Sequence, residues 1–182
     1  MDAAAEDRHG NSLRLLFAGL QAGMLGALWM LAWIGLSSTW QRRSFWTAEN
    51  LMATAFASDA PIRAGFVAST ISGLALYLVI YSLLGALFAF AVRGRVPRGR
   101  VLLWSVAFAL AWYYLSFHGI WKSVIPLVAR LHVERATVLG HLLYGTVLAR
   151  YPVYLERWEQ PAPSAEAEPQ PPAEAAEGTP SS

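Results

Sequence analysis

One stretch of the sequence constrains the fold more than any other, because residues 65–92 contain no charged side chain. About 20 consecutive apolar residues are enough for a helix to cross the hydrocarbon core of a bilayer, so this stretch predicts a membrane-spanning helix. It ends at a short loop with four arginines: Arg93, Arg95, Arg98 and Arg100. Because short loops rich in arginine stay on the cytoplasmic side, the loop also predicts the direction of the crossing.

The composition agrees with a membrane protein. Hydrophobic residues make up 55% of the 182 residues and charged residues only 14%, compared with about 25% charged residues in soluble proteins. The charged residues cluster between long neutral stretches, which is typical of membrane spans. A formal net charge of +2 is too small to indicate a nucleic-acid partner. The absence of cysteine excludes disulfides, iron–sulfur ligation by cysteine and thiol catalysis.

Four apolar segments predict an all-α polytopic membrane protein, a four-helix transmembrane bundle with spans at 13–36, 65–92, 101–118 and 134–155. The first is longer than the apolar core of a signal peptide, and no Ala-x-Ala cleavage site follows it, so we interpret it as an uncleaved helix. The fourth reaches the required length only if it continues through Arg150, whose side chain would extend to the headgroups.

The segments between and beyond the spans have their own patterns. Residues 1–12 form a polar N-terminal arm, which we expect to be disordered up to a helix cap at Ser12. The two outer loops, 37–64 and 119–131, carry aromatic and polar residues that favour segments lying in the membrane interface or re-entering it. The tail, 159–182, is rich in proline, alanine and glutamate and lacks aromatic residues, which predicts disorder.

Four spans place both termini and the arginine loop on one side. Eight of the 14 lysines and arginines would then be cytoplasmic and six external, so the totals barely discriminate between the two orientations. The density of arginine in 93–100 decides the prediction. We therefore expect a multi-pass protein of the bacterial inner membrane, the plasma membrane, with the N- and C-termini both inside.

Small and aromatic residues predict where the helices pack. Small residues at four-residue spacing allow close helix–helix approach, and a tyrosine hydroxyl in the membrane needs a hydrogen-bond partner inside the protein. Gln21, a strongly polar side chain in the first span, favours an interhelical hydrogen bond over a ligand contact. We expect Gly85 and Gly145 to bring the second and fourth spans together. The full set of predicted packing residues is Gly19, Gly23, Ala27, Gly73, Gly85, Tyr77, Tyr81, Tyr144 and Gly145.

The fourth span also carries the candidate site. Its polar stripe holds His141 between Thr137 and Tyr144, and His118 ends the third span on the same side. One interpretation is structural: neutral His141 forms a hydrogen bond with Tyr77 or Tyr81 of the second span. If the second and fourth helices lie diagonally across the bundle, its partner would instead be Gln21, Ser105 or Trp112. The other is that His141 and His118 ligate haem or bond a quinone.

Other enzyme signatures are missing from the sequence, including metal-spaced clusters, glycine-rich phosphate loops and serine–histidine–acid sets. Transport of ions usually requires a carboxylate within the membrane. We expect Glu49, Asp59 and Glu134 to lie at the membrane boundary instead.

Three short motifs carry a family resemblance. The stretches at 140–145, 72–77 and 50–56 (GHLLYG, SGLALY and NLMATAF) resemble small uncharacterised bacterial four-helix inner-membrane proteins. The resemblance covers about residues 13–158. It implies the four-helix fold, and it carries no activity, cofactor or site residue.

The sequence therefore favours an integral inner-membrane protein without a catalytic site, a structural or partner-binding subunit. Its partners would be the lipid bilayer and, through the strip Gly19, Gly23 and Ala27, a second copy or another membrane protein. The alternative is a redox-linked membrane subunit that binds haem or quinone through His141 and His118. A third is a small-solute transporter that acts as an oligomer.

Overall fold

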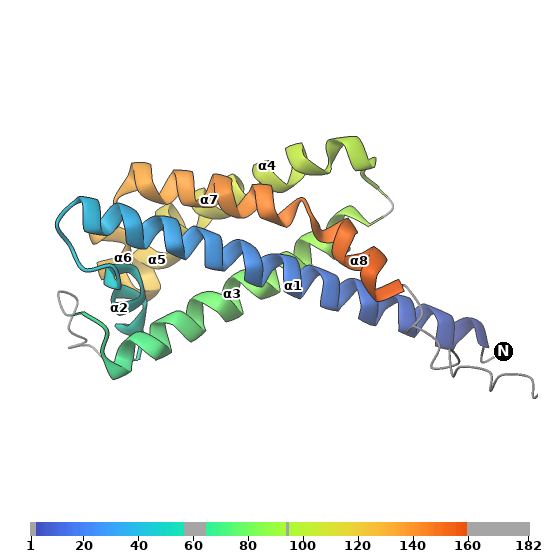
Figure 1. Ribbon diagram of the computed structural model, residues 1–182, viewed down its shortest axis with the longest axis horizontal. Helices are drawn as coiled ribbons and strands as arrows, with labels where there is room; N and C mark the ends of the chain where they lie inside the picture. The colour runs from blue at the N-terminus through green and yellow to red at the C-terminus, as the bar shows by residue number, and fades with distance from the viewer. Residues whose placement is uncertain (1–2, 57–64, 94, 160–182) are drawn as a thin grey trace, which may run out of the picture.

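The computed structural model describes residues 3–56, 65–93 and 95–159, and the regular structure in these ranges is helical (Figure 1). The long helices are α1 (Ala3–Trp40), α3 (Ala68–Val92), α4 (Val101–Leu115) and α7 (Glu134–Leu148). Shorter elements are α2 (Thr47–Ala53), the 3-10 turn η1 (Arg98–Arg100), the π-helical η2 (Ser116–Ile120), α5 (Trp121–Val124), α6 (Pro126–Leu131) and α8 (Tyr151–Glu159). We call the end of the bundle with α2, α5 and α6 the cap end, and the opposite end the arginine-loop end.

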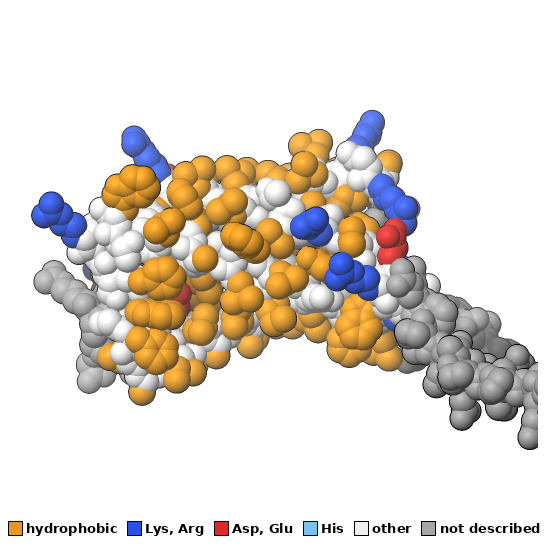
Figure 2. Space-filling model, viewed as in Figure 1, with side chains coloured by type: hydrophobic (Ala, Val, Ile, Leu, Met, Phe, Trp, Pro, Cys, Tyr) orange, Lys and Arg blue, Asp and Glu red, His pale blue; other side chains and the backbone are white. Residues whose placement is uncertain are grey.

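Three helical segments are long and apolar enough to span a membrane: Gly10–Trp40, Ala68–Val92 and Arg98–Val124. The 25 residues of α3 extend about 37 Å, compared with about 30 Å for the hydrocarbon core. Large apolar side chains such as Trp29 and Leu103 are 62% and 68% exposed. Figure 2 shows such side chains across the middle of the molecule, with lysine and arginine towards its two ends.

The first and third helices are longer than the sequence predicts. Because α1 begins at Ala3, the predicted disordered arm is wrong for residues 3–12, and Ser12 lies inside the helix instead of capping it. The third helical segment passes its predicted end at 118 and continues through η2 to Val124. Residues 119–131 are therefore not one interfacial segment. A new helix begins at Pro126, where the missing N–H of proline costs no hydrogen bond.

The predicted fourth span is interrupted. Helix α7 ends at Leu148, a turn follows, and α8 begins at Tyr151. The 15 residues of α7 extend about 22 Å, which is less than the hydrocarbon core requires. A bundle with four continuous membrane spans is thus not confirmed.

Helix α2, which comes from the segment predicted to lie in the interface, is buried inside the cap end. All seven of its residues are buried, and it packs on α3 at Gly73. A Cβ atom at Gly73 would overlap the carbonyl oxygen of Glu49, so only glycine allows this approach. Asp59, which we expect at the membrane boundary, and the tail 160–182 lie outside the described residues, as does most of the second half of the predicted outer loop.

The small residues set the order of the helices. Cβ atoms at Gly23 and Gly85 would lie 2.4 Å from the Tyr81 oxygen and 2.3 Å from the Gly19 oxygen, so α1 and α3 touch backbone to backbone. Gly145 instead meets α4, with Val106 Cα 2.8 Å from its would-be Cβ. The prediction that Gly85 and Gly145 join the second and fourth spans is therefore wrong.

The resulting packing order is α3, α1, α7 and α4, and α3 barely contacts α4. Because α3 covers Gly19 and Gly23, and Ala27 is buried, this strip serves packing within the chain. It is not free to bind a second copy.

Candidate functional site

A buried polar network lies at the centre of the bundle. His141 is 1% exposed, with its Nδ1 atom 2.8 Å from the Thr137 carbonyl oxygen and its Nε2 atom 2.9 Å from the Tyr81 hydroxyl. A carbonyl oxygen only accepts, so in neutral histidine Nδ1 carries the proton and donates it to Thr137. Nε2 then accepts the hydrogen bond that the Tyr81 hydroxyl donates. The geometry assigns both the tautomer and the donor.

The network joins helices that are diagonal in the bundle. The Tyr144 hydroxyl donates to the Tyr81 carbonyl oxygen at 2.8 Å, and the two rings lie edge to face with centroids 5.0 Å apart. Tyr77 stacks on Tyr81 at 5.7 Å. The predicted hydrogen bond between His141 and the second helix is confirmed, and Tyr81 is the partner. Long side chains make the connection because the backbones of α3 and α7 do not approach closely.

Helix α4 and the π-helical η2 close the network on its other side. The Tyr113 and Phe117 ring centroids lie 5.2 Å and 6.0 Å from that of His141. The buried Tyr113 hydroxyl and Trp112 Nε1 have no hydrogen-bond partner within the described part of the chain. Tyr113 lies in the aromatic layer around His141, where a water or a partner side chain would lower the cost of burying its hydroxyl.

The two histidines of the predicted cofactor site do not share a site. His118 is exposed on η2, and its ring stacks on Tyr114 at 4.5 Å. Tyr113 lies near both imidazoles, with centroid distances of 6.1 Å to His118 and 5.2 Å to His141. A haem iron at Nε2 of His141 would have to displace the Tyr81 hydroxyl. This arrangement does not offer the paired axial ligands that the haem form of the redox hypothesis requires.

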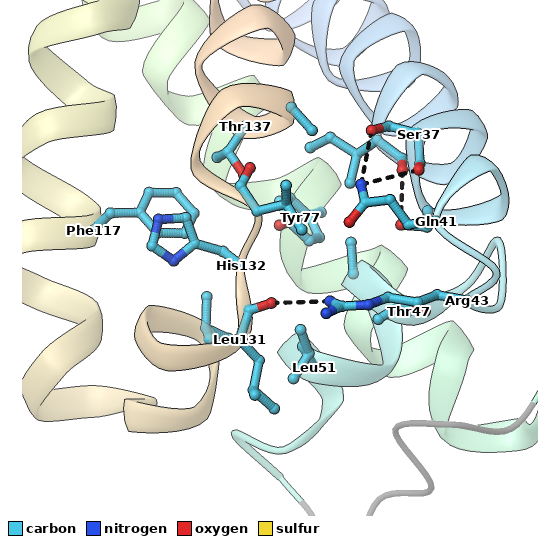
Figure 3. Close-up of a pocket in the computed structure, with 16 residues that line it drawn as sticks. Ser37, Gln41, Arg43, Thr47, Leu51, Tyr77, Phe117, Leu131, His132 and Thr137 are labelled. Atoms are coloured by element: carbon cyan, nitrogen blue, oxygen red, sulfur yellow. Dashed lines mark hydrogen bonds between the residues drawn. The ribbon is translucent and has the colours of Figure 1, made fainter.

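A small cavity of about 40 Å³, lined by both polar and apolar side chains, lies at the cap end (Figure 3). In its wall, Arg43 donates to the Leu131 carbonyl oxygen at 3.3 Å, and Gln41 donates to the Ser37 carbonyl oxygen at 3.1 Å. Tyr77 and Thr137 line the cavity and also belong to the network around His141. The volume is large enough for a water molecule but falls far short of the roughly 300–1,000 Å³ of sites for organic ligands.

The buried carboxyl group of Glu49 is the feature that sequence reasoning missed. Its side chain is 1% exposed, and Oε2 has no hydrogen-bond partner among the described residues. Burial raises the pKa of Glu49 to about 7 from its ordinary 4.5. The residue lies at the cap end and is enclosed by the protein. The sequence signal for such a buried polar group is that Thr47, Glu49 and Asn50 lie close together beside an apolar stretch.

The residue beside Glu49 fastens α2 to the start of α3. Thr70 donates to Asn50 Oδ1 at 2.6 Å and accepts from the Val67 N–H at 2.9 Å. The Asn50 amide donates to the Gly65 carbonyl oxygen at 3.3 Å. These bonds satisfy the first turn of α3 and hold the Glu49 backbone against Gly73. The position of Glu49 is thus a consequence of a well-bonded junction.

At the opposite end, Gln21 forms the predicted interhelical hydrogen bond. Its Oε1 accepts from Trp158 Nε1 at 3.3 Å, and Trp158 stacks on Phe17 at 5.5 Å. These contacts hold α8 along the first half of α1. The prediction of a structural role for Gln21 is confirmed.

Neither a metal-binding cluster in the described residues nor a known relative indicates a function for this chain. Within the described residues, no group of three or more histidine, cysteine, aspartate or glutamate side chains is placed to hold a metal ion. No family model, no curated protein and no solved structure matches the chain.

Proposed function

We propose that this protein is a non-catalytic integral protein of the bacterial inner membrane, a structural or partner-binding subunit. The observation that carries the proposal is the state of His141. Both of its ring nitrogens are bonded inside the protein, and the small cavity near it has a volume of about 40 Å³. A histidine that is bonded on both sides and closed off from substrate-sized space fixes the packing of three helices.

We also propose that α7 and α8 together make the fourth crossing. Glu134 begins α7 at the cap end, while Glu156 Oε1 in α8 pairs with Arg98 Nη2 at 2.6 Å at the other end. The bond from Trp158 to Gln21 supports the same course. The chain then returns to the side where it began, which fits the proposed N-in, C-in orientation and the family resemblance to four-helix proteins.

Single cysteines at two open glycines test this topology in a chain that contains no cysteine. Gly65 at the cap end and Gly99 at the arginine-loop end are exposed, and neither has an atom within 4 Å of a would-be Cβ. A membrane-impermeant maleimide on intact cells should label Gly65→Cys and spare Gly99→Cys. Labelling of only Gly99→Cys would show the opposite orientation, and labelling of both would refute the proposal that the two ends lie on opposite sides of the membrane.

The partner surface must differ from the one that the sequence favours. The strip at Gly19 and Gly23 is covered by α3, so association would use lipid-facing side chains such as Trp29 or Leu103. Surfaces of this kind associate in membranes by packing and without a hydrophobic driving force. Partner binding through an outer face is the form of the proposal that the packing supports.

Two measurements on protein from native membranes test the role. Size-exclusion chromatography with light scattering in mild detergent should give a protein mass above the 19.9 kDa of one chain. The same sample should show no Soret absorption and no stoichiometric quinone in its lipid extract. A monomer with a Soret band that His141→Ala removes and His118→Ala shifts would replace the proposal with the redox function.

A further inference from the structure

The open side of the bundle carries a groove. Helices α3 and α4 follow one another in the chain, yet they scarcely touch. A hollow of about 510 Å³ lies between the last turns of α3 and the first turns of α4, next to the arginine loop. This volume is within the roughly 300–1,000 Å³ of sites that bind small molecules, and it far exceeds the cavity at the cap end.

Small side chains create the hollow. Ala91 on α3 and Ala107 and Ala111 on α4 line it and are exposed. Phe88 also lines it and is buried, with its ring centroid 5.4 Å from that of Phe108. The lining is therefore apolar along its length and suits a hydrocarbon chain.

The depth of the groove matches one leaflet. Helix α4 rises about 16 Å from Arg100 to Ala111, and half of a 30 Å hydrocarbon core is about 15 Å. Trp104, which is 53% exposed, lines the groove one turn after the arginine loop, a position that suits an interfacial aromatic side chain. An acyl chain that entered from the headgroup region would follow the groove to about the midplane.

The mouth of the groove is positively charged. Arg95 is the charged residue in its lining, and its Nη1 donates to the Ala91 and Phe90 carbonyl oxygens at 3.1 Å and 3.4 Å. These bonds hold the guanidinium beside the mouth, with further N–H donors left for a ligand. Arg93 and Arg100 are exposed nearby, and the one ion pair found in the described residues joins Arg98 to Glu156.

We propose that this groove binds an anionic phospholipid, with one acyl chain between α3 and α4 and the phosphate at Arg95. Charge complementarity selects an anionic headgroup, because basic pockets between helices at the membrane surface attract such lipids. The leaflet-length apolar groove selects a lipid over a free phosphate. The inference needs a membrane location, but it depends on neither the partner-binding role nor the orientation.

Native mass spectrometry of the full chain in mild detergent tests the proposal with phosphatidylglycerol and phosphatidylcholine of identical acyl chains. The wild type should retain one phosphatidylglycerol in clear preference to phosphatidylcholine. Arg95→Gln should reduce that preference about fivefold, the equivalent of about 1 kcal/mol for one arginine. Ala107→Trp should abolish retention of either lipid, because the indole would fill the groove.

Two matched variants control for charge and bulk. Arg135→Gln removes an exposed arginine outside the groove, and Ala75→Trp adds an indole to an exposed position of α3 outside the groove. Both should behave as the wild type. Equal retention of the two lipids by the wild type, or unchanged preference in Arg95→Gln, overturns the proposal. A wild-type dimer that Ala107→Trp dissociates would assign the groove to a second copy. If Ala107→Trp does not fold, the Arg95→Gln comparison still decides, since it adds no volume.

Discussion

Replacing Glu49 with glutamine tests whether the carboxyl group is buried as the structure has it. The side chain is 1% exposed, with Oε2 unpaired among the described residues. The charged form is therefore cut off from water, and a hydrogen bond from its own backbone offsets only part of that cost. Glutamine has the same shape and no charge to desolvate. We therefore expect Glu49→Gln to stabilise the protein at alkaline pH and to change its stability little at acidic pH.

The magnitude follows from the difference between the folded and unfolded pKa values. Burial raises the folded pKa of Glu49 to about 7 from an ordinary value of 4.5. At about 1.4 kcal/mol per pKa unit, the difference corresponds to about 3 kcal/mol. Because the folded state binds the Glu49 proton more tightly than the unfolded state does, the contribution of this proton to the free energy of unfolding is fully present below pH 4.5. It falls as the pH rises to about 7 and stays lower above that value.

Thermal unfolding in detergent at a series of pH values between 4 and 9 measures this effect. The wild type should lose stability between pH 4.5 and 7 relative to Glu49→Gln, and the two midpoints should be farthest apart above pH 7. Glu134→Gln, which removes an exposed carboxylate near the same end, serves as the matched control for general charge effects. Parallel pH profiles for the wild type and Glu49→Gln would refute the burial of an unpaired carboxyl group.

Two further substitutions test the helix contacts. Gly85→Ala should destabilise the protein by about 1–3 kcal/mol, because its Cβ would lie 2.3 Å from the Gly19 carbonyl oxygen. An unchanged midpoint of thermal unfolding would contradict that contact. Gly99→Ala, at a position in open space, is the control. Tyr81→Phe should cost about 0.6–2 kcal/mol, because Nε2 of His141 loses its donor. In a double-mutant cycle with His141→Leu the two effects should be strongly non-additive, and simple additivity would argue against the bond.

Hydropathy predicted the long helices well because it measures what a membrane requires, a sufficient length without charge. It failed at the ends of the helices. The polar residues before Leu13 can continue a helix once it protrudes from the apolar region, so α1 reaches back to Ala3. The fourth segment was ambiguous for the same reason: Arg150 falls where the helix needed to continue, and the chain turns there.

The identity of packing residues was predictable, but their partners were not. A glycine at helical spacing permits a close approach whatever helix arrives. Gly85 therefore serves α1 and Gly145 serves α4, although the sequence suggested that they meet. The Glu49 side chain is a stronger example of a contact that the sequence does not predict. Its burial depends on α2 folding onto Gly73 of α3, a contact between segments about 20 residues apart that no local pattern encodes.

The arrangement of small and large residues explains why one side of the bundle stays open. Neighbouring helices meet through glycines, as α1 and α3 do at Gly23 and Gly85. Helices across the diagonal meet through long polar side chains, as Tyr81 and His141 do. Near the arginine loop, α3 and α4 are joined neither by a glycine contact nor by long polar side chains. The alanines there are too small to fill the space between the two helices, so under the lipid proposal an acyl chain completes the packing.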